Sequence, residues 1–105
     1  MIVQADIDDI DREYFEILAW NLYCITIRSY STGHYWHLLE QIANGHQTFR
    51  ISHKHNKKDP YHLQTNRPSV ASCCEYIRSH DAYHLERTRR KEERQMHRQK
   101  NTFHG

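Results

Sequence analysis

Apolar and polar residues alternate on both sides of Asn44-Gly45. An Asn-Gly pair between two alternating runs is typical of a two-residue β-hairpin turn. Such a turn pairs Ala43 with His46, and each later pair follows one step further along both strands. Because successive side chains point to opposite faces, one face of this hairpin is mainly apolar and the other mainly polar and basic.

The preceding residues 22–29 are rich in β-branched side chains that alternate with polar ones, which predicts another strand. A four-residue loop, residues 30–33, then pairs Ser29 with His34. This register adds the apolar residues of the earlier strand to the apolar face of the hairpin. The predicted core face consists of Tyr23, Ile25, Ile27, Trp36, Leu38, Ile42, Phe49 and Ile51.

Helices are expected on both sides of these strands. Apolar residues recur at three- and four-residue spacing in residues 6–20, behind an acidic first turn, and again in residues 70–86, where Asn66 or Ser69 can cap the helix. Residues 61–64 fit either a short fourth strand or an extended link. The pattern predicts an α+β fold in the order α-β-β-β-α, a three-stranded antiparallel meander with an N-terminal helix and a longer C-terminal helix packed on one face.

A hydrophobic content of 37% is low for a compact domain of 105 residues. Part of the chain is therefore expected to lie outside the core. We expect a single compact domain over residues 1–86 and a basic helical extension or tail over residues 87–105. No apolar run is long enough to span a bilayer, and the acidic N-terminus is unlike a signal peptide. The three cysteines, two of them adjacent, form no disulfide framework or CxxC motif, so a reduced, cytoplasmic protein without a membrane partner is expected.

The net charge of +2 hides a strong asymmetry along the chain. The first twenty residues carry six acids and one base, whereas the rest is basic. A basic body favours an anionic partner, with DNA or RNA as the first candidate. The basic residues of the C-terminal extension are Arg87, Arg89, Arg90, Lys91, Arg94, Arg98 and Lys100.

The polar face of the predicted sheet suits the same partner. Arg and Lys contact phosphates or guanine edges, and Tyr or His can stack on exposed bases. An ordinary solvated sheet face is the alternative. The candidate contacts on this face are Arg28, Tyr35, His37, Arg50 and Lys54. Together with the Arg-rich helix they predict a small, non-enzymatic nucleic-acid-binding protein.

Ten histidines in this chain also raise a metal hypothesis. In the derived register three of them meet at one end of the apolar face, where imidazoles on adjacent strands can bind zinc or copper. These candidate ligands are His34, His53 and His55. His62 could reach them from the following segment, and His80 and His84 form a second pair on one helix face.

Sequence motifs for catalysis are missing: the chain has no Gly-rich phosphate loop and no GxSxG motif. A pair formed by Cys73 or Cys74 with His80 or His84 would lack an oxyanion hole and a third orienting group, so packing is the favoured role of these cysteines. Small size and segregated charge therefore leave one further hypothesis, a protein-binding inhibitor or adaptor of the phage or mobile-element type that acts on a nucleic-acid enzyme.

In topology, the expected element order is similar to the double-stranded RNA-binding domain and to the arm-type DNA-binding domains of tyrosine integrases. The resemblance implies a sheet-and-helix module that contacts nucleic acid. The chain lacks the Gly-Pro-x-His-type loop and the Lys-rich helix start of the RNA-binding family. No residue role is therefore carried over from either family.

Overall fold

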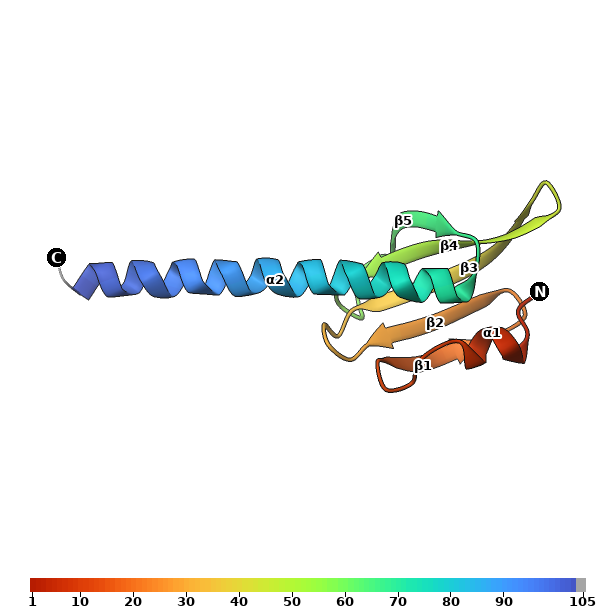
Figure 1. Ribbon diagram of the computed structural model, residues 1–105, viewed down its shortest axis with the longest axis horizontal. Helices are drawn as coiled ribbons and strands as arrows, with labels where there is room; N and C mark the ends of the chain where they lie inside the picture. Colours follow the sequence, from red (N-terminus) through yellow and green to blue (C-terminus); the bar gives the residue numbers. More distant parts are fainter. Residues whose placement is uncertain (104–105) are drawn as a thin grey trace.

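Five antiparallel strands form one sheet in which spatial order follows chain order (Figure 1). The computed structural model describes the backbone of residues 1–103 and the side chains of residues 1–98. Its elements are α1 (Gln4–Asp8), β1 (Phe15–Trp20), β2 (Cys24–Ser29), β3 (Tyr35–Ala43), β4 (His46–Lys54), β5 (His62–Arg67) and α2 (Val70–Phe103). The mixed α+β class is thus confirmed, but the sheet has five strands and not three.

The hairpin register derived from the turn residues is confirmed. Ala43 pairs with His46, and Trp36 pairs with His53 seven steps further along β3 and β4. Asn44 and Gly45 have φ angles of 53° and 76°, the left-handed conformation that a type I′ turn requires. The predicted pairing of β2 with β3 is also present, so both hairpins present the same face to the core.

The N-terminal helix predicted over residues 6–20 is wrong. The helix α1 has only five residues, and the chain turns at Asp11, whose side chain accepts a hydrogen bond from the Glu13 amide. Residues 15–20 then form β1, which pairs with β2 with one irregularity in register. Pairing with β2 provides hydrogen-bond partners for the backbone groups of β1. The spacing of apolar residues fits a helix equally well and does not reveal this partner.

The uncertain segment before the last helix is a strand, β5, which pairs with β4 and places His62 opposite His53.

Two residues predicted for the core, Tyr23 and Ile42, are 61% and 67% exposed. They lie at the end of the sheet where the β3–β4 hairpin extends past the start of α2 (Figure 1), so no helix covers them. The extra strands also remove the topological similarity to the two nucleic-acid-binding families.

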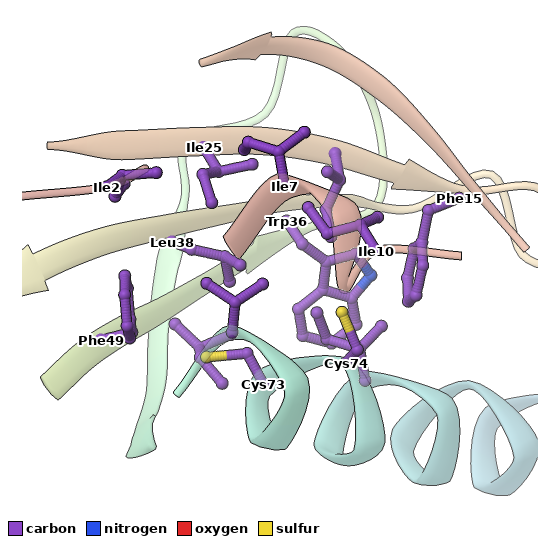
Figure 2. Packing of buried hydrophobic residues seen from close by; sticks show 14 residues of the cluster. Ile2, Ile7, Ile10, Phe15, Ile25, Trp36, Leu38, Phe49, Cys73 and Cys74 are labelled. Atoms are coloured by element: carbon purple, nitrogen blue, oxygen red, sulfur yellow. The ribbon is translucent and has the colours of Figure 1, made fainter. Parts of the chain in front are cut away.

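One hydrophobic cluster joins both helices to the same face of the sheet (Figure 2). Trp36, Leu38 and Phe49 are fully buried at its centre. The adjacent cysteines Cys73 and Cys74 are free thiols packed in this cluster. The buried hydrophobic residues are Ile2, Ile7, Ile10, Phe15, Ile25, Ile27, Trp36, Leu38, Phe49, Ile51, Val70, Cys73, Cys74 and Ile77.

Helix α2 begins after Ser69, whose hydroxyl oxygen accepts a hydrogen bond from the Ser72 amide and thereby caps the helix. Its 34 residues span about 51 Å at 1.5 Å per residue. The first half covers the sheet and the second half projects beyond it (Figure 1), which gives the molecule its 65 Å length. No helix of the described chain is long and apolar enough to cross a membrane. Residues 104 and 105 of the predicted extension lie outside the described residues.

Candidate functional sites

The open face of the sheet, on the side away from α2, brings together three of the predicted contact residues. Arg28 pairs with Tyr35 across β2 and β3, and Tyr35 pairs with Lys54 across β3 and β4. The guanidinium of Arg28 and the ammonium of Lys54 each lie 5.4 Å from the centre of the Tyr35 ring. These three side chains form one cation–π row across the sheet.

A tyrosine outside the predicted set extends this row. The Tyr61 ring lies 4.5 Å from Lys54 Nζ and 5.7 Å from the His37 ring. Burial lowers the pKa of His37, which favours its neutral form. Tyr61 precedes β5, a strand that the sequence left open, so its position on this face had no clear signal in the sequence.

Several contacts already hold the cations of the open face. Arg28 Nε donates a hydrogen bond to the carbonyl of Gly33, and Lys54 Nζ donates one to the carbonyl of Lys57. Glu16 faces Arg28 in the β1–β2 register and adds negative charge. Arg50 is exposed and faces Leu39 on the same face. The open face is therefore a packed, mildly basic surface with half-buried aromatic rings.

The projecting half of α2 separates its charges around the helix. Arg89 pairs with Glu86 and Glu93, and Arg90 pairs with Glu86. Three further predicted basic residues of the described half make no ion pair with residues 1–98. They are Arg87, Lys91 and Arg94, here called the basic stripe. Lys100 belongs to the predicted extension, but its side chain lies outside the described residues.

The basic stripe follows one side of the helix because its members are four and three residues apart. Glu86 and Glu93 lie about 80° or more around the helix axis from each of its members, given 3.6 residues per turn. The Arg87 guanidinium rests 5.9 Å from the centre of the Tyr83 ring. The stripe is a row of exposed positive charge without compensating carboxylates on the same side.

A cluster of histidine rings fills the space between the end of the sheet and α2. The three predicted metal ligands are brought together: the rings of His34 and His55 stack with centroids 4.0 Å apart, and the His53 ring lies 4.9 Å from each of them. Helix α2 adds His84, whose ring is 4.6 Å from that of His34, and His80, whose ring is 4.9 Å from that of His53. The sequence identified the pair on α2 but not its meeting with the strand histidines.

His34 and His53 are both buried and share a hydrogen bond of 3.0 Å between His34 Nδ1 and His53 Nε2. Burial, together with the neighbouring imidazoles, lowers the pKa of His34 to about 4 and that of His53 to about 3. The Trp36 ring stacks on His53 at 4.1 Å. Both histidines are therefore neutral near pH 7 and held in place.

A buried carboxylate, Asp81 on α2, fixes the loop that carries His34. It accepts hydrogen bonds from the Tyr14 hydroxyl at 2.7 Å and from the Thr32 hydroxyl at 3.2 Å. The Thr32 oxygen in turn accepts the amide of His34 at 3.2 Å. Burial and this carboxylate raise the pKa of Tyr14, although its contact with Ser31 acts in the opposite direction. Asp81 thus ties the β2–β3 loop to the helix.

An open cleft of about 630 Å³ lies beside the histidine cluster. His62 lines this cleft, as the sequence suggested, and so do Asp59, Tyr83 and Arg87. Arg87 belongs to the basic stripe, so the cleft joins the histidine cluster to the positively charged side of α2.

The buried cysteines do not resemble an activated nucleophile. Burial raises the pKa of Cys73 to about 12 and that of Cys74 to about 11, which disfavours the thiolate that would react. Their place in the hydrophobic cluster supports a packing role.

The chain matches no protein-family model, and searches of curated proteins and of solved structures found no significant match.

Proposed function

We propose that this protein binds nucleic acid without catalysing a reaction, with the basic stripe of α2 as its main contact and the open sheet face as a second one. The observation that carries this proposal is the stripe itself, three cations on one side of an exposed helix with no ion pair among the described residues. Unpaired Arg and Lys side chains on such a helix can neutralise phosphates and release bound counterions.

The exposed surface of the same helix favours a polyanion over a second helix. Its projecting half, residues 87–98, is exposed throughout, and Met96 is its one large apolar residue. A helix that packs against a partner helix needs an apolar stripe, which this segment lacks. Phosphates require only positive charge at this spacing.

Fluorescence anisotropy with labelled duplex and single-stranded oligonucleotides tests the proposal. If three phosphates are neutralised, log affinity should fall against log salt with a slope of about −2.7 on duplex DNA. Neutralising the stripe in Arg87→Gln/Lys91→Gln/Arg94→Gln should remove most of this dependence. Absent binding, a flat salt plot, or wild-type affinity in the triple variant would reject the proposal.

A matched pair of single variants gives a sharper comparison. Arg94→Gln and Arg89→Gln each remove one positive charge from α2, but Arg89 is paired with Glu86 and Glu93. Arg94→Gln should reduce the magnitude of the slope by about 0.9, and Arg89→Gln should reduce it by less. Neutralising Arg28, Arg50 and Lys54 measures the share of the sheet face in the same assay.

The second candidate function is a protein-binding inhibitor or adaptor, and the β1 edge of the sheet supports it. Strand β1 is an edge strand, and Leu18 and Trp20 on it are 42% and 41% exposed. An exposed edge with apolar side chains suits strand addition by a protein partner. A protein that copurifies after nuclease treatment and is lost in Trp20→Ser would favour this function over nucleic-acid binding.

A further inference from the structure

Three histidines from distant parts of the chain bring ring nitrogens close together. Candidate ligand atoms of His34, His55 and His84 all lie within 4.8 Å of one another. His34 precedes β3, His55 follows β4, and His84 lies on α2, so each comes from a different element. We propose that these three imidazoles bind one Zn²⁺ ion.

The chemistry of the donor set fits this ion. Neutral imidazoles are common zinc ligands, and three protein ligands with an open fourth position are typical of accessible zinc sites. Nitrogens about 2.05 Å from a tetrahedral zinc ion are about 3.3 Å apart. The three nitrogens therefore need to converge by at most about 1.5 Å. The His55 ring must also turn out of its parallel stack on His34, so that both lone pairs point at one ion. His55 is exposed and His84 is half-buried, so both side chains have room to turn.

Hydrogen bonding leaves the required nitrogens free. Within residues 1–98, the side chains of His55 and His84 make ring contacts but no hydrogen bond. These two rings instead face each other and His34 at the edge of a cleft.

His53 has the position of an outer partner that orients a metal ligand. Its Nε2 contacts His34 Nδ1 at 3.0 Å, so His34 can donate from Nδ1 and keep Nε2 for the metal. Histidine ligands to zinc usually make such a second hydrogen bond, which fixes the tautomer and the ring orientation. The proposed site thus reassigns His53 from ligand, as the sequence suggested, to positioning residue.

The fourth position of the zinc ion would face the cleft. Asp59 and His62 line this cleft, and Arg87 brings positive charge to the same space. Zinc binding is independent of the nucleic-acid proposal, because none of its three ligands belongs to the basic stripe.

The test uses the full chain, purified without an affinity tag or a metal column and stripped with a chelator. Competition against a chromophoric chelator should show one Zn²⁺ per chain with a dissociation constant below about 1 μM, about −8 kcal/mol. Co²⁺ in place of zinc should give the strong visible absorption of a four-coordinate site. Wild-type protein without one site of this affinity overturns the proposal.

Variants separate this site from adventitious histidine binding. His55→Gln and His84→Gln change residues that are not fully buried and should each weaken binding by at least about tenfold. His53→Gln should weaken it by about 10- to 100-fold and alter the Co²⁺ spectrum. His46→Gln, at the exposed start of β4, is the control and should keep wild-type affinity. Equal losses in His46→Gln and His84→Gln, or full affinity in the His55→Gln/His84→Gln double variant, would overturn the proposal.

Discussion

The two halves of α2 belong to one continuous helix but are stabilised in different ways. Residues 70–85 bury an apolar stripe that includes Cys73 and Ile77 against the sheet. Residues 87–98 bury nothing and rely on helix propensity and exposed ion pairs. The covered half is therefore a scaffold that positions side chains, whereas the projecting half presents charge to solvent.

The candidate sites follow the same division. His80 and His84 occur where α2 still lies against the sheet, and the basic stripe begins one turn later at Arg87. A metal site needs ligands from several elements to lie close together, which packing of the helix against the sheet supplies. Phosphate contacts tolerate a mobile surface, so an unsupported helix is sufficient for them.

Removing packing from the covered half should give the largest effect. Ile77→Ala deletes a fully buried side chain and should lower the free energy of unfolding by about 2–5 kcal/mol. Met96→Ala, in the projecting half, changes a residue that is 61% exposed and should shift stability by less than about 0.5 kcal/mol. Urea unfolding followed by circular dichroism measures both, and similar losses would contradict the distinction between the two halves.

Lowering the pH should give the next largest effect, through two buried histidines of the sheet on which the covered half packs. The pKa values of about 4 for His34 and about 3 for His53 lie below the usual value of 6.5. Between pH 6.5 and these folded-state values, the unfolded chain therefore binds more protons than the folded chain. Their contribution is fully present above pH 6.5 and is lost as pH falls through the folded values. Each displaced pKa unit corresponds to about 1.4 kcal/mol, so a loss of at least about 1 kcal/mol is expected between about pH 7 and about pH 4.5.

Metal-free urea midpoints across this pH range provide the measurement, with a chelator present throughout. The variant His53→Gln lacks one of the two groups and should show a weaker pH dependence than the wild type. A variant with the same pH dependence as the wild type would contradict the assignment to these histidines.

Breaking ion pairs in the projecting half should give the smallest effect. Glu86→Gln removes the carboxylate that pairs with Arg89 and Arg90. We expect faster amide hydrogen exchange in residues 87–98 and an unchanged global unfolding midpoint, because this half can fray without exposing the core. A lower global midpoint in this variant would show that the projecting half contributes to the fold.

Local rules were sufficient for the central hairpins. Asn44-Gly45 specifies its turn, and the period of two along β3 and β4 then fixes which side chains share a face. The same rules brought Arg28, Tyr35 and Lys54 into one row and placed His34, His53 and His55 at one end of the sheet. These features depend on residues that are neighbours in the chain or across one turn.

Tertiary structure decided the outer strands. The apolar spacing of residues 6–20 fits a helix, but β1 gains its hydrogen bonds from β2, and this partner is known only once the sheet exists. Strand β5 depends in the same way on β4. Edge strands take their stability from a neighbour, so their own sequence is a weak signal.

The candidate metal centre shows the same limit. The sequence by itself determined that strand histidines meet at the open end of the β3–β4 hairpin, away from the Asn44-Gly45 turn. It also determined that two more histidines occupy one face of α2. Only packing of α2 against the sheet, through Cys73 and Ile77 in the core and Asp81 beside the β2–β3 loop, brings His84 to His34 and His55. Spacing along a chain defines positions on one element, whereas the convergence of three elements depends on the core they bury together.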